Sequence, residues 1–333
     1  MKVAVSGITP AGCMTATLLA DAGEDVCIVG TPEKLARVAG KKLTVRQVWD
    51  GKVISSSVPV SLYPPFVPDV LVFADRVQDT LAAAERLLPY AGEATVATIQ
   101  YGTKTEQIVG KIFPRDSIVT CVLTFGANCA TPGDVTLNFK GYMVIGRAYD
   151  APDWREDNVM ELMSGAFSTR RGKKIAHVNC TRLLLNLPYC IPGIIGEKVQ
   201  KAFLDPDVAE VAVLLLKEGM DIIKKDVHIE ALPDFNEDSL NELVNSPLPE
   251  AAANFMLAVV SLSRVPCEGP VLGSIERGEL SEVDYQNGEM VNIARAIGRE
   301  APLNSLMVRL VHEVERTGRF IPKDEFLSYV KKI

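Results

Sequence analysis

Residues 1–30 constrain the fold more than any other part of the chain. An apolar run over 2–7 ends at a glycine, a helical pattern over 11–23 ends at another glycine, and a second apolar run follows over 25–30. Short apolar runs bounded by turn residues are typical of buried strands. A strand, a helix and a strand in this order predict parallel pairing of the two strands. The start of the chain therefore predicts a βαβ unit.

The same alternation continues to about residue 146. Residues 133–146 alternate between apolar and polar and carry turn glycines, which predicts an antiparallel hairpin at the edge of the sheet. Together these patterns predict an α/β domain with a Rossmann-like, doubly wound sheet. The further segments are strands over 69–74, 94–102 and 117–129 and helices over 77–92 and 103–113.

The pattern changes after about residue 150. Residues 151–175 predict a polar helix and a connection, and helical spacing replaces the strands beyond them. A length of 333 residues suits two domains with full cores. We expect a Rossmann-like dinucleotide-binding domain over 1–172 and an all-helical domain over 173–333 for substrate binding and dimerisation. The helical segments are 179–196, 205–227, 249–264, 281–298 and 302–318.

Composition and charge exclude several classes of function. The net charge of −7 argues against a nucleic-acid binder, and no apolar run reaches the roughly 18 residues of a membrane span. The N-terminus does not resemble a signal peptide, so we expect a cytoplasmic protein. The seven cysteines are scattered without C-x-x-C spacing and the three histidines lie far apart. We expect buried thiols and no metal site.

The turn after the first strand is the candidate phosphate-binding element. It runs from Gly7 to Gly12, at a strand-to-helix junction where free backbone N–H groups and the helix dipole favour an anion. Thr9 stands where a glycine normally lets the backbone approach a pyrophosphate. Its side chain would crowd a dinucleotide, or its hydroxyl would donate to a phosphate or to a smaller anion. Pro10 lacks an N–H, and a first turn with no ligand is the alternative.

The end of the second strand carries no clear reader of the ribose. An acidic residue there favours NAD, and an arginine suits the extra phosphate of NADP. The chain has Thr31 at this place, followed by Glu33, Lys34 and Arg37 within about one helical turn. The sequence does not choose between NAD and NADP.

The whole chain resembles the ketopantoate reductase family (2-dehydropantoate 2-reductases). The segment over 269–291, in which Glu282 precedes "VDYQNG", is the most specific part of this resemblance. The resemblance implies a Rossmann domain, a helical domain and reduction of a 2-oxo acid by NADPH. It also implies a lysine that protonates the carbonyl oxygen and an asparagine, a serine and a glutamate that hold the substrate. The other segments that carry it are 1–30, 68–89, 97–106, 124–146 and 182–190.

Only part of the family's site is matched. Asn186 takes the place of the substrate asparagine and Glu282 that of the glutamate, whereas Arg182 takes the place of the catalytic lysine. The departures fall on the positions implied to line the site, while the segments that form the fold are kept. This contrast indicates a site rebuilt for another purpose or a loss of redox function. The remaining departures are Pro270 for the serine, Asp75 for a lysine on the cofactor side, Tyr101 and Cys190 for asparagines, and Thr31 for an arginine.

The replacements change the expected chemistry. Arg182 keeps its proton at ordinary pH, so it would bind a carboxylate or polarise a carbonyl rather than act as an acid. Asp75 brings a negative charge to the cofactor side. Tyr101 would stack on a ligand, fill the site or pack as a loop aromatic. The alternatives are structural roles: Arg182 would form a surface ion pair, Asn186 would bond to the backbone near a helix end, and Glu282 would interact with the N-terminus of the following helix.

We therefore expect an NAD(P)H-dependent oxidoreductase that acts on a carboxylate-bearing carbonyl compound other than ketopantoate, in a cleft between the domains. The alternative is a non-redox homologue whose degenerate cofactor site and interdomain cleft serve a different reaction or bind a ligand. In either case we expect the ligand of the cleft to bear a carboxylate and a sizeable apolar part. A homodimer is possible in either case. The expected catalytic residues are Arg182, Asn186 and Glu282. The expected cofactor-binding residues are Gly7, Thr9, Pro10, Ala11, Gly12, Thr31, Asp75, Gln100 and Tyr101.

Overall fold

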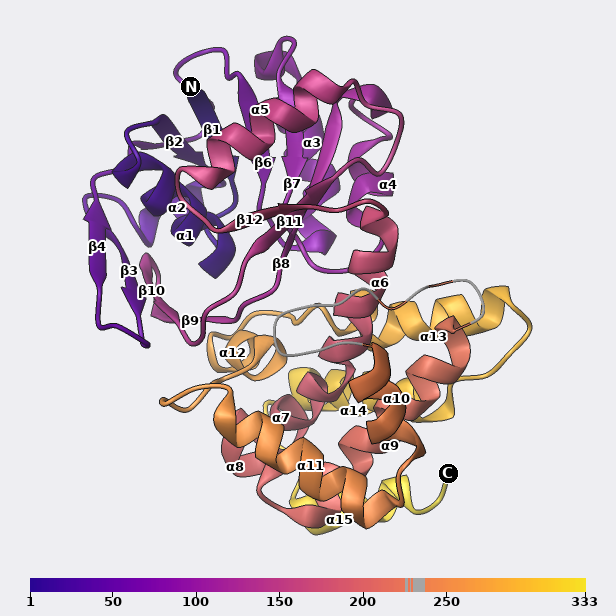
Figure 1. The fold of residues 1–333 in the computed structure, drawn as a ribbon. Helices are drawn as coiled ribbons and strands as arrows, with labels where there is room; N and C mark the ends of the chain where they lie inside the picture. Colours follow the sequence, from indigo (N-terminus) through magenta and orange to yellow (C-terminus); the bar gives the residue numbers. More distant parts are fainter. Residues whose placement is uncertain (225–226, 228, 230–236) are drawn as a thin grey trace. The chain divides into compact units, whose positions relative to one another are not determined.

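The computed structural model describes residues 1–333 except 225, 226, 228 and 230–236 (Figure 1). The chain divides into two compact units, Met1–Asn179 and Cys180–Ile333. Each unit has its own hydrophobic core and is described by itself. Among the described helices, none is both long and apolar enough to cross a membrane.

The first unit is built on an eight-stranded sheet in the order β12-β11-β8-β7-β6-β1-β2-β5. Six neighbouring strands, from β8 to β5, run parallel, and β11 pairs antiparallel with β8. The parallel strands follow the doubly wound order, which reverses direction between β1 and β6. The strands are β1 (Lys2–Ser6), β2 (Asp25–Val29), β5 (Val60–Ser61), β6 (Val70–Phe73), β7 (Thr95–Thr98), β8 (Ile118–Leu123), β11 (Met143–Gly146) and β12 (Thr169–Arg171).

Helices cover both faces of this sheet. One core contains α1 (Pro10–Asp21) and α5 (Asp153–Ser164), whose Met14 and Leu162 are buried with Val3 and Val5. The other contains α3 (Thr80–Ala91) and α4 (Thr105–Val109). Because β1 alternates Val3 and Val5 toward one core with Ala4 toward the other, both faces of the strand are apolar.

A second, four-stranded sheet corrects the predicted hairpin. Its order is β4-β3-β10-β9, with β10 parallel to β3. The predicted hairpin over 133–146 is therefore wrong, because β10 joins this sheet and β11 joins the main one. The strands within 43–61 and β12 were not predicted. The strands of the second sheet are β3 (Leu43–Gln47), β4 (Val53–Ser56), β9 (Ala127–Thr131) and β10 (Asp134–Leu137).

The described part of the second unit is helical. α6 (Ile175–Asn186) begins in the first unit and continues into the second, where Leu184 and Leu187 enter the core. A Cβ at Gly219 of α9 would lie 2.6 Å from both leucines, so α9 packs closely on the end of α6. The other helices are α7 (Cys190–Ile195), α8 (Val199–Phe203), α9 (Pro206–Ile223), α10 (Glu237–Asn245), α11 (Leu248–Ser261), α12 (Pro270–Glu276), α13 (Asn287–Ala296), α14 (Pro302–Thr317) and α15 (Lys323–Val330).

The predicted fold class is confirmed: a Rossmann-like doubly wound sheet is followed by a helical region. The cysteine prediction is also confirmed. None of the seven cysteines, all of which lie in the described part of the chain, forms a disulfide, and all but the half-buried Cys180 are buried.

Candidate functional site

The turn after β1 requires glycine for packing reasons. Gly7 has φ +108°, and a Cβ there would lie 2.6 Å from the backbone nitrogen of Asp75. A Cβ on Gly12 would lie 2.0 Å from the Gly7 carbonyl oxygen. The Gly7 N–H donates to Val29 O at 2.9 Å. The turn is thus pressed against the carboxyl ends of β2 and β6, the geometry that dinucleotide-binding turns use.

Thr9 closes this turn through its side chain. Its hydroxyl donates to Ala74 O at 2.6 Å and accepts from Gly12 N at 3.0 Å, so Thr9 caps the N-terminus of α1. Pro10 occupies the first helical position and has no N–H, whereas Ala11 retains an N–H that these bonds do not use. The Thr9 hydroxyl thus donates its hydrogen to Ala74 O, so in this structure it is not available to donate to a phosphate.

Asp75 is a buried carboxyl at the end of β6, only 6 % exposed. The hydroxyl of Ser6, at the end of β1, donates to it. Burial raises the pKa of Asp75 to about 6, although the Ser6 bond and the charges of Lys34 and Arg86 oppose that rise. A carboxyl group with a raised pKa therefore lies where the order of the strands reverses direction, between β1 and β6.

The cations near Asp75 are engaged elsewhere. Lys34 of α2 (Pro32–Ala36) forms an ion pair with Asp79 at 2.6 Å. Arg86 donates to the carbonyl oxygen of Leu62. Thr31 is exposed at the end of β2 and makes no side-chain capping bond. The residue at the end of β2, where a reader of the ribose is expected, is thus a neutral threonine rather than an acidic or basic residue.

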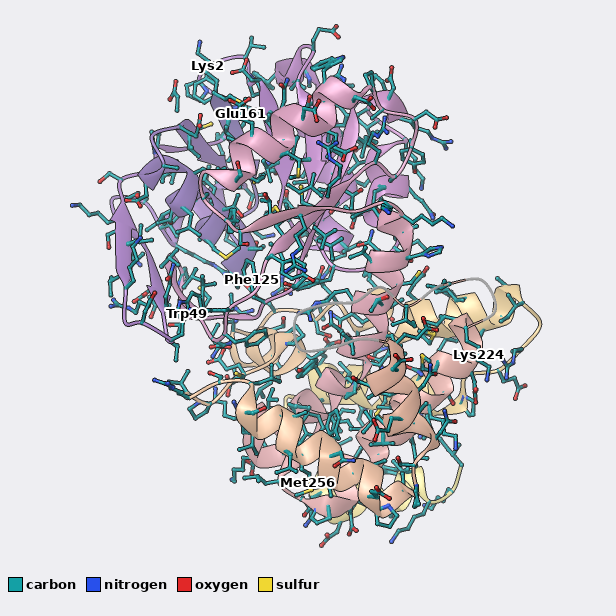
Figure 2. The ribbon with its side chains drawn as sticks, viewed as in Figure 1. Lys2, Trp49, Phe125, Glu161, Lys224 and Met256 are labelled. Atoms are coloured by element: carbon teal, nitrogen blue, oxygen red, sulfur yellow. The ribbon has the colours of Figure 1, made fainter. Side chains whose placement is uncertain are left out.

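Gln100 and Tyr101 follow β7 directly. Gln100 Nε2 donates to Thr80 Oγ1 at 3.1 Å, while its Oε1 is buried without a hydrogen-bond partner among the residues that the structure describes. The Tyr101 hydroxyl donates to the carbonyl oxygen of Phe125, labelled in Figure 2, at 3.3 Å. The Tyr101 ring packs against the core of the first unit. Gln100 therefore offers a buried acceptor to a ligand, and Tyr101 is held as a packed aromatic.

Two of the predicted catalytic residues lie on α6. Arg182 is half-buried and Asn186 is buried four residues later, so both are on one face of the helix. Cys190 is buried in the apolar core, and burial raises the pKa of its thiol. Pro270 opens α12.

Glu282 lies in a segment that is joined to the end of α6. It is half-buried and precedes a 3₁₀ turn, Val283–Tyr285. Asn287, five residues later, donates to Leu187 O at 3.1 Å and to Asn304 Oδ1 at 2.9 Å. The sequence reasoning missed Asn287 as a structural link, although it lies in the "VDYQNG" segment that was singled out.

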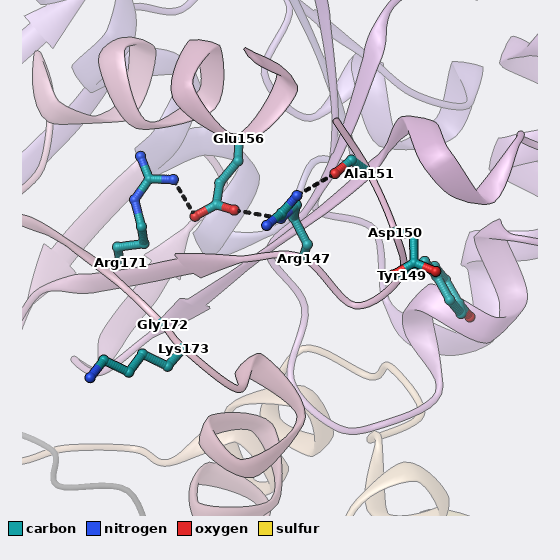
Figure 3. A pocket seen from close by; sticks show the side chains of 8 residues that line it. All are labelled: Arg147, Tyr149, Asp150, Ala151, Glu156, Arg171, Gly172 and Lys173. Carbon is teal, nitrogen blue, oxygen red and sulfur yellow. Dashed lines mark hydrogen bonds and ion pairs between the residues drawn. The ribbon is translucent and has the colours of Figure 1, made fainter. Parts of the chain in front are cut away.

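A pocket of about 390 Å³ lies elsewhere in the first unit (Figure 3). Buried Glu156 of α5 accepts from Arg147 Nε at 2.9 Å and from Arg171 Nη1 at 2.8 Å. Because β11 runs antiparallel to β8, these arginines lie at the sheet edge opposite the Gly7 turn. Arg147 also pairs with Asp153 and Arg171 with Asp157, both outside the pocket, so the two arginines are already engaged by carboxylates. None of the predicted site residues lines the pocket. The pocket is lined by Arg147, Tyr149, Asp150, Ala151, Glu156, Arg171, Gly172 and Lys173.

Comparisons with known proteins cover nearly the whole chain. The family model "Ketopantoate reductase PanE/ApbA" matches residues 3–149, and its C-terminal counterpart matches residues 174–315. A 2-dehydropantoate 2-reductase of Pyrococcus abyssi is 24% identical over 315 residues, which is 93% of this chain and 97% of the relative.

Solved structures share the fold. A PanE/ApbA family ketopantoate reductase from Ralstonia eutropha has a TM-score of 0.75 at 20% identity, covering 95% of this chain and 99% of that one. A D-mandelate dehydrogenase in a ternary structure with NADH and anilino(oxo)acetate has a TM-score of 0.77 at 16% identity, with coverage of 95% and 99%.

Proposed function

Since this chain belongs to the ketopantoate reductase family, we propose that it is a nicotinamide-dependent reductase of a 2-oxo acid other than ketopantoate. One observation carries the proposal: the Gly7–Gly12 turn lies where the sheet order reverses between β1 and β6. In open α/β sheets, ligands bind outside the carboxyl ends of the strands at this reversal. The tight packing of both glycines maintains the backbone path that such a site needs.

The residues around the turn fit a dinucleotide without a 2′-phosphate better than one with it. The orphaned Gln100 Oε1 suits a ligand N–H or hydroxyl donor. Thr31 offers no cation to an added phosphate, and the ion pair of Lys34 with Asp79 would have to break before Lys34 could bind one. We therefore propose NADH as the preferred cofactor, in line with the NADH present in the D-mandelate dehydrogenase neighbour.

The side chains on the helical unit suggest how the substrate is held. A bound nicotinamide would supply the hydride. Arg182, which stays charged, binds the substrate carboxylate or polarises its carbonyl through charge-assisted hydrogen bonds. Asn186 and Glu282 hold other polar groups of the substrate. Because a guanidinium does not release its proton at ordinary pH, the proton that completes the product hydroxyl comes from a group other than Arg182.

Titration of the purified protein with NADH and NADPH, followed by nicotinamide fluorescence, tests the cofactor proposal. NADH should bind at least about 10-fold more tightly than NADPH, because an electrostatic cost of about 1.4 kcal/mol has this effect. NADH oxidation should then be followed with ketopantoate and with 2-oxo acids bearing aliphatic or aromatic side chains. Absence of binding of either dinucleotide at high micromolar concentrations would refute the reductase proposal.

A second candidate function follows from the closed turn. Thr9 and Asp75 both bond within the protein at the place where a dinucleotide would bind, which favours a homologue that binds a carboxylate without a redox cofactor. Thermal-shift screening of carboxylic acids against the parent and Arg182→Ala separates the two functions. The binding protein would be stabilised by an acid in the absence of nicotinamide, and Arg182→Ala would lose that stabilisation.

A further inference from the structure

Glu106 is a buried carboxyl that the proposed reaction does not use. It lies in α4, just after the Gln100–Tyr101 segment, and is only 6 % exposed. One of its oxygens, Oε1, accepts from Thr120 Oγ1 at 2.9 Å and from Asn179 Nδ2 at 3.2 Å. This single atom therefore joins a strand of the sheet, β8, to the first turns of α6.

Burial makes the charged form of Glu106 more costly than it would be in water. Burial raises the pKa of Glu106, while the hydrogen bonds from its own backbone, Thr120 and Asn179 oppose that rise. Burial, together with the nearby charge of Glu106, also raises the pKa of the Cys121 thiol, which packs in the core on the other face of β8. A neutral carboxyl keeps an acceptor oxygen for both donors without the cost of a buried charge.

Asn179 is placed to transmit this bond along α6. Arg182 and Asn186 follow it by three and seven residues, so the three side chains lie on one face of the helix. Asn179 is the last residue of the first unit, whereas Arg182 and Asn186 belong to the second. The bond from Asn179 to Glu106, made within the first unit, therefore holds the face of α6 that carries these three side chains.

We propose that Glu106 is a positioning residue: by holding Asn179, it sets the direction in which Arg182 and Asn186 project from α6. The inference rests on the proposed reductase function for its kinetic consequence. A loosened bond to Asn179 lets the helix rotate or fray at its start. Misplacement of a substrate-binding side chain by about 1 Å can lower a rate by about 10²-fold.

Two variants separate positioning from general support of the fold. Asn179→Ala removes the bond from α6, and Thr120→Val removes a bond to the same oxygen that lies within the sheet. In the full-length protein, Asn179→Ala should lower kcat by about 10²-fold and accelerate amide hydrogen exchange over 175–186. Its affinity for NADH should stay within about twofold of the parent. Thr120→Val should leave kcat and exchange in α6 unchanged.

Changes at Glu106 itself complete the test. Glu106→Gln keeps a neutral acceptor and should retain the parental kcat, whereas Glu106→Leu should behave like Asn179→Ala. An equal loss of kcat in Asn179→Ala and Thr120→Val would overturn the proposal, as would unchanged exchange over 175–186 in Asn179→Ala. If the parent reduces no 2-oxo acid, the proposed function fails, and the exchange measurement alone still decides whether Glu106 holds α6.

Discussion

The Thr9 side chain uses a hydrogen-bonding group of the Gly7–Gly12 turn, the candidate phosphate-binding element. Its hydroxyl bonds both to Ala74, 65 residues away in the sequence, and to Gly12 in the next helical turn. The Gly12 N–H is therefore already bonded within the protein and is not available to a phosphate. Affinity for a dinucleotide should therefore depend on the removal of this hydroxyl as well as on the space that the side chain occupies.

Thr9→Gly should bind NADH more tightly than the parent. The change frees the Gly12 N–H and lets the backbone approach the pyrophosphate. Loss of the cap and of the bond to Ala74 should lower the free energy of unfolding by about 1 to 2 kcal/mol. Fluorescence titration and urea denaturation measure the two effects. Thr9→Ser keeps both bonds and is the control; if Thr9→Gly binds no better than Thr9→Ser, Thr9 does not limit the site.

Asp75 should make the stability of the first unit fall as pH rises. Its folded pKa of about 6 lies above the unfolded value of about 3.9, so the folded state binds the proton more tightly. The contribution is fully present below pH 4 and is lost as pH rises through about 6, with a total near 3 kcal/mol. Urea denaturation of the parent and Asp75→Asn between pH 3.5 and 8, in the manner of a linkage analysis, gives the difference between the two proteins. A constant difference across that range would contradict the pKa.

Arg182→Lys should raise any turnover of ketopantoate with a nicotinamide. The family resemblance places a proton-donating lysine here, and general acid catalysis contributes about 10² to 10⁴ in rate. Steady-state kinetics of both proteins at saturating cofactor measure the effect on kcat. Efficient turnover of ketopantoate by the parent would show that Arg182 does not impair the reaction.

At the level of single residues, the sequence shows which side chains stand at the site but not what they touch. Thr9, Asp75 and Tyr101 could be singled out because each departs from an expected residue type. Their partners Ala74, Ser6 and Phe125 could not, because these contacts depend on the packing of separate strands. Glu106 gave no sequence signal, since a glutamate in a short helix is ordinarily solvated.

Among the elements, strand pairing was the least predictable feature. Alternation revealed residues 134–137 as a strand but did not name its partner. That partner is β3, which pairs in parallel and in which Thr44 lies opposite Asp134. The parallel strands of the main sheet were predictable because long apolar runs alternate with helices. Edge strands such as β12 are short, and the mixed polarity of Thr169–Arg171 resembles a loop.

The link between α5 and the last two strands of the main sheet, β11 and β12, should depend on Glu156. Glu156→Ala leaves the guanidinium groups of Arg147 and Arg171 without their shared carboxylate, and should lower the free energy of unfolding by about 2 kcal/mol. The arginines are 38% and 50% exposed, so solvent limits the cost. The control is Asp157→Ala. It removes the ion pair of Arg171 with a carboxyl that is 59% exposed, and it should lower the free energy of unfolding by under about 1 kcal/mol. Equal losses in urea denaturation would contradict this role for Glu156.

For the whole molecule, two separate cores imply that unfolding need not be a single step. The compact units divide inside α6, between Asn179 and Cys180, and the domain boundary predicted after residue 172 stays a prediction. Both tryptophans, Trp49 and Trp154, belong to the first unit, so their fluorescence reports on that unit alone. Far-ultraviolet circular dichroism reports largely on the helical unit.

NADH should stabilise the first unit selectively. At a concentration of 100 Kd, a ligand that binds only the folded state adds about 2.7 kcal/mol to its stability. The free energy of unfolding from the tryptophan transition in urea should rise by this amount. The transition of the helical unit, followed by circular dichroism, should keep its midpoint. Coincident fluorescence and dichroism transitions that move together would show instead that the chain unfolds as one cooperative unit.

The contact between Gly12 and the Gly7 carbonyl has a consequence for reading function from genomes. A Cβ at Gly12 would collide with that oxygen whether or not a nucleotide is bound, so folding alone requires the glycine. A lineage that abandoned redox chemistry would still have to keep Gly7 and Gly12. Their presence in a newly sequenced chain therefore indicates the fold. The residues that match Thr9 and Asp75 are the ones that indicate the chemistry.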